Sequence, residues 1–107
     1  MPAPMKSADF HILLALAEGP CHGYGLMKEV ERESHGEVRL EIGSLYRLLA
    51  RMLDSGLIEE TETSGDERRR NYRISRTGRR ALKSEAARLV ELVDLARARK
   101  LLADSDS

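Results

Sequence analysis

Three polar side chains recur on one face of a predicted helix, where they could contact a polyanion. The spacing of apolar residues predicts this helix over about residues 43–55. The face opposite the apolar residues carries Ser44, Arg47 and Arg51. An arginine can donate two hydrogen bonds to guanine in the major groove of DNA, and the free N–H groups near Gly43 can bind a phosphate. The alternative is that both arginines are ordinary exposed helix residues.

A second group of arginines lies in a predicted β-hairpin that follows this helix. Ser64-Gly65-Asp66 predict the turn, and residues 70–74 predict the return strand. The arginines beside this turn are Arg68, Arg69 and Arg70. We expect them to contact DNA phosphates or the minor groove. The alternative is that they pair within the hairpin with the glutamates of the outgoing strand, Glu59, Glu60 and Glu62.

The charge of the chain is balanced overall but divided along its length. The 18 basic and 18 acidic residues give a formal net charge of zero. Residues 1–67 nevertheless hold 6 Lys+Arg against 13 Asp+Glu, and residues 68–107 hold 12 against 5. From Arg68 to Lys83 there are eight basic residues and no acidic one. Because this run spans a turn, a strand and a helix start, one solvated helix face does not explain it, and we expect an anionic partner.

The residues that commonly bind metals or perform catalysis lack the necessary spacing. Cys21 is the only cysteine, and His11, His22 and His35 are scattered along the chain. No Ser-His-Asp order, glycine-rich phosphate loop or catalytic carboxylate pair stands out. We therefore expect no enzyme activity, no metal site and no cofactor.

The sequence contains no pattern typical of a membrane span or an exported protein. No apolar run approaches the ~20 residues that cross a bilayer. The first seven residues lack the apolar core of a signal peptide. With a single cysteine, these features predict a cytoplasmic protein without a membrane partner.

Two helices are predicted before the polar-faced one. Ser7 is expected to cap the first helix, which ends at the Gly-Pro pair of residues 19–20. The second helix is expected over about residues 24–34. Its outer surface should be acidic because of Glu29, Glu31 and Glu33. Residues 37–41 are expected to be extended and to pair with the strands of the hairpin.

The third helix has the clearest apolar pattern. Its inward stripe is Leu45, Leu48, Leu49, Met52 and Leu53. Gly56 is expected to end the helix in a left-handed conformation, and a strand begins at Leu57. Tyr46 flanks the polar face, and two roles stay open for it: contact with DNA, or packing with its hydroxyl at the surface.

The last helix is expected to be too long for its own domain. It should be capped by Ser75 and run to about Ala103, so that its ~28 residues span ~40 Å. Apolar residues in steps of four and three form a seam, Leu82, Ala86, Leu89, Val93 and Ala96. Residues 76–107 are therefore expected to form a homodimer interface, after a DNA-binding domain over residues 1–75.

Helices, a polar-faced helix and a basic hairpin in this order predict a winged helix-turn-helix. This is an α+β fold, mainly α, with a long C-terminal dimerisation helix. Three segments then resemble signatures of the PadR family of bacterial winged-helix transcriptional regulators: HGYGLMKEVE, GSLYRLLARMLDSGLI and RRRNYRISRTGRRAL. The resemblance covers about residues 8–90. The chain departs from it at Glu41, where the family often has Ser or Thr before the recognition helix.

The resemblance implies a homodimeric repressor that binds a palindromic operator in double-stranded DNA. Release of the DNA by a small effector is a further expectation, and the sequence does not specify the effector's chemistry. A winged-helix protein-interaction module without DNA binding is the alternative, which the basic hairpin opposes. An enzyme or a metal-dependent sensor is opposed by the missing catalytic and ligand spacings.

Overall fold

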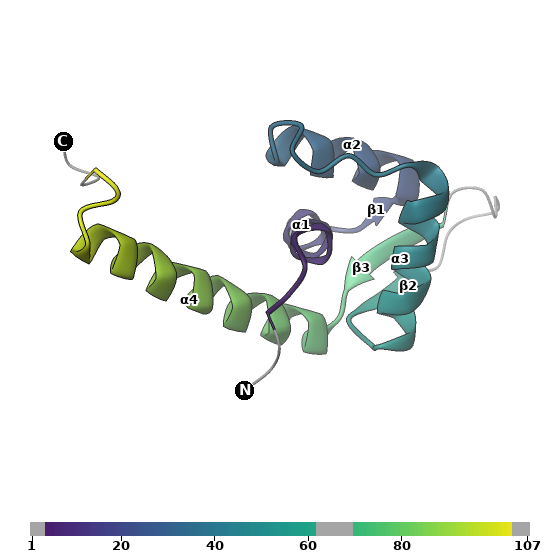
Figure 1. Cartoon of the computed structure of the whole chain (residues 1–107). Coiled ribbons are helices and arrows are strands. Elements are labelled where there is room, and N and C mark those ends of the chain that lie inside the picture. Colours follow the sequence, from purple (N-terminus) through teal and green to yellow (C-terminus); the bar gives the residue numbers. More distant parts are fainter. Residues whose placement is uncertain (1–3, 62–69, 104–107) are drawn as a thin grey trace.

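A computed structural model describes residues 4–61 and 70–103, and this part of the chain forms four helices and three short strands. The helices are α1 (Ser7–Leu16), α2 (Gly23–Glu33), α3 (Ile42–Asp54) and α4 (Arg76–Ala98). The strands are β1 (Cys21–His22), β2 (Ile58–Thr61) and β3 (Asn71–Ile74). The first three helices and the sheet form one body, from which α4 projects (Figure 1). The expected mainly helical α+β fold with a long C-terminal helix is confirmed.

The strands form one antiparallel sheet in the order β1-β3-β2. On one side β3 pairs with β2, with Ile58 opposite Ile74. On the other side β3 pairs with β1, where Cys21 lies opposite Tyr72. The hairpin strands predicted from the sequence are therefore present, with a third strand added from the segment before α2.

That third strand is not the one predicted. Residues 37–41 were expected to pair with the hairpin, and this prediction is wrong, because β1 takes the open edge of β3. The backbone of the linker is bonded locally instead, since the Val38 N–H donates to Ser34 Oγ at 3.0 Å. The linker leads from α2 to α3 with Val38 and Leu40 packed against the core.

Two helices are capped by side chains. Ser75 Oγ accepts a hydrogen bond from the Gly78 N–H at 2.9 Å at the start of α4, as the sequence predicted. At the start of α2, His22 Nδ1 accepts from the Gly25 N–H at 3.1 Å. Each cap satisfies a backbone donor that the helix itself cannot bond.

The other two helices begin without a side-chain cap. The expected Ser7 cap is wrong, because Ser7 is already the first residue of α1 and Lys6 is the N-cap. The Lys6 carbonyl accepts the Phe10 N–H at 3.0 Å, which places the helix start one residue earlier. At α3 the N-cap is Glu41, whose carbonyl accepts the Leu45 N–H at 2.8 Å while its side chain caps nothing.

The hydrophobic core lies where α1, α2 and α3 meet. Its largest fully buried side chains are Ile12, Leu13, Leu16, Leu26, Val30, Leu45, Leu49, Met52 and Ile58. The predicted inward stripe of α3 is confirmed, with Leu48 and Leu53 half-buried at its edges. Gly56 ends α3 at a φ of +76°, a conformation that costs little only for glycine.

The acidic outer surface predicted for α2 is partly wrong. Glu33 faces α1, where its Oε2 lies 2.8 Å from His11 Nδ1, and its side chain is only 16% exposed. The other ion pairs of α2 are Glu29–Arg32 and Glu31–Arg39. Each glutamate of the predicted surface therefore has a partner.

The last helix ends earlier than predicted but still extends beyond the domain. It stops at Ala98 because Lys100 adopts a left-handed conformation with a φ of +61°, and the Leu101 N–H donates back to the Ala96 carbonyl at 2.9 Å. Its 23 residues span ~34 Å. No helix within the described ranges is long and apolar enough to cross a membrane.

Candidate nucleic-acid interface

The exposed face of α3 carries the polar residues that the sequence placed there. Arg47 is exposed, and its Nη2 donates to Ser44 Oγ at 3.3 Å. A side chain added at Gly43 would meet no atom within 4 Å. Because Glu41 leaves the start of α3 without a side-chain cap, its first backbone N–H groups remain available to an anion.

Arg51 lies on the same face but is held by a carboxylate from α1. Its Nη2 donates to both oxygens of Asp9, at 2.9 Å to Oδ1 and 3.2 Å to Oδ2. The Asp9 side chain is 13% exposed and that of Arg51 is 51% exposed. Sequence reasoning missed this pair, because the two residues are 42 positions apart and Asp9 also suits the first turn of α1.

A groove of ≈ 400 Å³ runs between the N-terminal end of α1 and the exposed side of α3. Its lining residues are Lys6, Ala8, Asp9, Leu40, Ser44, Arg47, Leu48 and Arg51. Three of these side chains are cationic and one is anionic. Lys6, which the sequence pattern did not single out, therefore joins the predicted residues of α3 at one surface.

Tyr46 packs against the start of α2. An added Cβ at Gly23 would lie 2.7 Å from the Tyr46 hydroxyl, so the glycine leaves the space that the ring occupies. Tyr46 remains 42% exposed. Burial raises the pKa of the neighbouring Tyr72, Glu60 and Tyr46 raise it further, and Arg70 opposes them. The packing role left open by the sequence is present, and part of the ring still faces solvent.

The hairpin of β2 and β3 is the wing of the winged-helix fold. Its described part holds one of the three predicted arginines, Arg70. Arg68 and Arg69 lie outside the described residues. Arg70 Nη1 lies 3.6 Å from Glu60 Oε1, an exposed ion pair of the kind that the sequence offered as an alternative. Such surface pairs contribute only ~0–1 kcal/mol, so Arg70 can exchange Glu60 for a phosphate at little cost.

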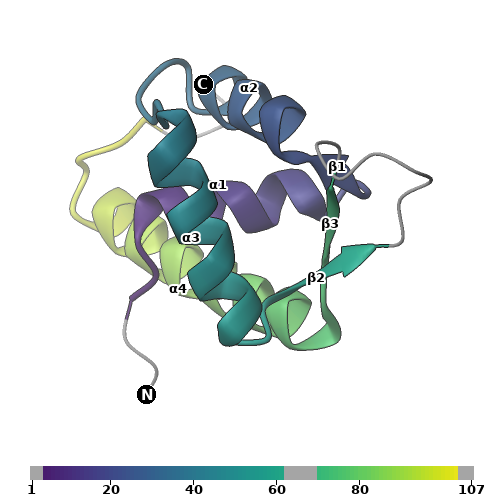
Figure 2. The ribbon, with the colours of Figure 1, turned by 90° about the vertical axis from the view of Figure 1, so that its right-hand side faces the viewer.

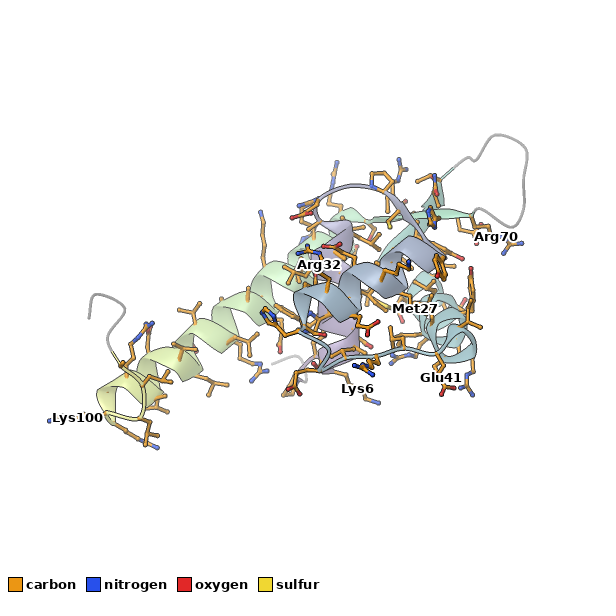
Figure 3. The ribbon with its side chains drawn as sticks, turned by 90° about the horizontal axis from the view of Figure 1, so that it is seen from above. Lys6, Met27, Arg32, Glu41, Arg70 and Lys100 are labelled. Atoms are coloured by element: carbon orange, nitrogen blue, oxygen red, sulfur yellow. The ribbon has the colours of Figure 1, made fainter. Side chains whose placement is uncertain are left out.

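Cations stand on both sides of α3. Figure 2 views the molecule along α4, with α3 in front, the N-terminal segment on one side and β2 and β3 on the other. Figure 3 shows Lys6 and Arg70 on opposite sides of this helix. This order of cation, polar helix face and cation suits a groove of DNA with a phosphate strand on either side.

The residues of the predicted seam of α4 differ in how much of their surface the domain itself covers. Leu82 is 7% exposed and belongs to the domain's own core, which leaves it little surface for a partner. Leu89 lines a hollow of ≈ 310 Å³ with Met5 and Phe10. Val93 is 38% exposed, beyond these contacts. Ala86 is exposed and Ala96 is half-buried.

The histidines and the cysteine form no metal cluster in the ranges that the structure describes. His11 pairs with Glu33, and His22 caps α2. Burial raises the pKa of the Cys21 thiol, with Glu29 adding to the shift. Two of the three histidines are thus engaged in bonds that hold helices in place.

The sequence matches the model of a family described as "Transcriptional regulator PadR-like family" over residues 12–84. A curated relative from Streptomyces fradiae, an uncharacterized 37.1 kDa protein in transposon TN4556, is 38% identical over 87 residues. Those residues are 81% of this chain and 24% of the relative, so the chain spans about a quarter of that protein's length.

Solved structures share the fold. A transcriptional regulator from Clostridium thermocellum has a TM-score of 0.69 at 26% identity, over 85% of this chain and 87% of that chain. A PadR family transcription regulator from Clostridium difficile R20291 has a TM-score of 0.72 at 21% identity, over 87% of this chain and 97% of that chain. Bacillus subtilis PadR in complex with operator DNA has a TM-score of 0.65 at 22% identity, over 76% of this chain and 47% of that chain.

Proposed function

The chain belongs to the PadR-like family of transcriptional regulators, and we propose that it is a homodimeric repressor that binds a palindromic operator in double-stranded DNA. Regulators rather than enzymes make up the family and the fold neighbours. Release of the DNA by a small effector is part of the same proposal.

The exposed face of α3 is the observation that carries the proposal. Arg47 and the uncapped helix start lie on it, between Lys6 on one side and Arg70 on the other. The operator complex of Bacillus subtilis PadR supports it, since that protein uses the same fold with operator DNA. A protein-interaction module would have no need of this flanked basic face.

The residues of the interface have two roles in this proposal. On α3, Ser44, Arg47 and Arg51 face base edges or the groove walls. The backbone N–H groups near Gly43 bind a phosphate, and the exposed part of Tyr46 contacts the DNA beside them. The wing arginines, Arg68, Arg69 and Arg70, bind phosphates. Phosphate contacts fix position, whereas contacts with base edges distinguish sequences.

The dimer interface in this proposal is the part of α4 that extends beyond the domain. Ala86, Leu89, Val93 and Ala96 form its seam. The first turns of the proposed dimerisation segment, residues 76–107, pack through Gly78 and Leu82 against the proposed DNA-binding domain of residues 1–75. Two copies related by a twofold axis would present two α3 helices to two half-sites.

The direct experiment is selection of bound duplexes from a randomised DNA pool by the purified protein, together with a mobility shift on the DNA upstream of its gene. The expected result is an inverted repeat whose half-sites lie about one helical turn apart, 10–10.5 base pairs. Recovery of sequences without any shared site would contradict a sequence-specific regulator.

Replacing Arg47 with alanine is expected to weaken binding to the selected operator by ~1–3 kcal/mol per lost base contact. It should relax preference at one symmetric pair of positions, because Arg47 faces the groove from a rigid helix. Fluorescence anisotropy with operator and scrambled duplexes measures the effect. Arg99→Ala, which removes the same charge beyond the end of α4, is the control. Equal loss on both duplexes would make Arg47 a phosphate contact.

Replacing Arg68 and Arg70 together with alanine is expected to act on all sequences alike. Each phosphate contact contributes about −0.9 to the slope of log affinity against log salt. Two lost contacts per subunit should therefore flatten the slope of a dimer by ~4 at most. A slope that does not change would show that these arginines pair within the hairpin instead.

A further inference from the structure

We propose that Asp9 is a specificity-determining residue, because it orients Arg51 at the DNA-facing groove and keeps that arginine from binding phosphates of any sequence. The inference rests on the proposed function. The inference adds to that function the Asp9 carboxylate of α1, which contacts no DNA base and acts through Arg51 of α3.

The geometry of the pair leaves Arg51 both fixed and available. Both oxygens of Asp9 bond the same nitrogen, Nη2, at 2.9 and 3.2 Å. A guanidinium has five N–H donors, so the donors on Nη1 and Nε remain for another partner. The Arg51 side chain is 51% exposed while the Asp9 side chain is 13% exposed. The largely buried carboxylate thus anchors Nη2, while about half of the arginine side chain stays exposed.

The charges of the groove give this anchor its effect. Lys6 and Arg47 line the groove with the pair, and neither forms an ion pair among the described residues. The Asp9 carboxylate reduces the net charge of the groove from three cations to about two. Leu40 and Leu48 supply apolar walls. A phosphate entering the groove therefore meets Lys6 and Arg47 more favourably than Arg51.

Discrimination between sequences follows from this division. Binding to any DNA depends on phosphate contacts, each of which releases counterions. Specificity is a difference between affinities, so a contact changes it only when the operator and other sequences gain unequally from that contact. An oriented Arg51 can meet the groove of the operator without paying to order its side chain. A freed Arg51 would become a mobile cation, and scrambled DNA would gain more from it than the operator.

The test compares Asp9→Asn, Arg51→Ala and the double variant with the wild type. Affinities for the selected operator and for a scrambled duplex are measured across a series of salt concentrations. Asp94→Asn, which removes one carboxylate on α4 far from α3, controls for net charge. Thermal unfolding of each variant establishes that it is folded.

Asp9→Asn is expected to raise the affinity for scrambled DNA by about 10-fold at low salt and to steepen the salt slope by ~0.9 per subunit. The affinity for the operator should change by less than about 2-fold, because its gain in phosphate binding is offset by the lost orientation of Arg51. The operator preference should therefore fall by about 5-fold or more. The Asp94→Asn control should show neither change.

The double variant decides whether Asp9 acts through Arg51. It should bind scrambled DNA as Arg51→Ala does, because no arginine remains to be freed. A higher affinity in the double variant would show direct repulsion of phosphate by Asp9 and would overturn the positioning role. An unchanged slope and preference in folded Asp9→Asn would also overturn it.

Two further measurements bear on the inference, one on Arg51→Ala and one on the wild type. If Asp9→Asn does not fold, Arg51→Ala alone must lower operator binding several-fold more than scrambled binding, and an equal loss overturns the inference. Failure of the proposed function would appear separately, as a wild-type protein that does not prefer the selected operator. Such a wild type removes the premise, whereas the outcomes above concern Asp9 alone.

Discussion

Replacing Gly78 with alanine is expected to destabilise the domain by about 3 kcal/mol or more, which lowers Tm by roughly 12 °C or more. An added Cβ would lie 1.9 Å from the carbonyl oxygen of Leu57 and 3.0 Å from Ile74 Cγ1. The first obstacle is backbone, which cannot swing aside as a flexible side chain can.

Two hydrogen bonds also hold the backbone at Gly56 and Leu57 in place. The Leu57 carbonyl accepts the Ser75 N–H at 3.1 Å, and Ser75 Oγ donates to the Gly56 carbonyl at 2.5 Å. These bonds join the end of α3 to the start of α4. Any shift that makes room for a methyl group must break them, so the cost exceeds that of ordinary overpacking.

Thermal unfolding followed by circular dichroism measures this effect, and Gly43→Ala is the matched control. Gly43 is also helical, but an added Cβ there meets nothing within 4 Å. Alanine is favoured over glycine in a helix by up to ~1 kcal/mol, so this variant should keep or raise Tm. A Gly78→Ala protein as stable as the wild type would contradict the packing of α4 against Leu57.

Val93→Glu is expected to convert the proposed dimer into monomers, with the dissociation constant raised about 100-fold or more. A glutamate at the seam would be buried without a partner, and an uncompensated buried charge costs ~3–5 kcal/mol. Val93 is a cleaner site than Leu89, which also lines the hollow beside Phe10. Its side chain is 38% exposed in the single chain, so the change should leave the domain folded.

Sedimentation velocity at micromolar protein concentration distinguishes the two states. Ala87→Glu is the control, because Ala87 is exposed on the opposite side of α4 and receives the same charge. It should remain dimeric. A Val93→Glu protein that sediments as the wild-type dimer would place the interface elsewhere, and a monomeric wild type would contradict the homodimer itself.

The sequence determined the features that depend on neighbouring residues. Helix periodicity, the Ser75 cap and the glycine that ends α3 all act within about four positions along the chain, so their pattern can be read directly. The polar face of α3 follows from the same periodicity, because burying its leucine stripe leaves the opposite side exposed. For this reason the winged fold and the positions of Ser44 and Arg47 were predictable.

Only the tertiary structure decided which distant residues meet. The strand that contains Cys21, rather than residues 37–41, pairs with the free edge of β3. Leu82 lies in the domain's core, although its spacing equally suited a dimer seam. The Asp9–Arg51 pair joins residues 42 positions apart. Such contacts depend on how helices cross and which edges remain free, and periodicity along one helix holds no information about either.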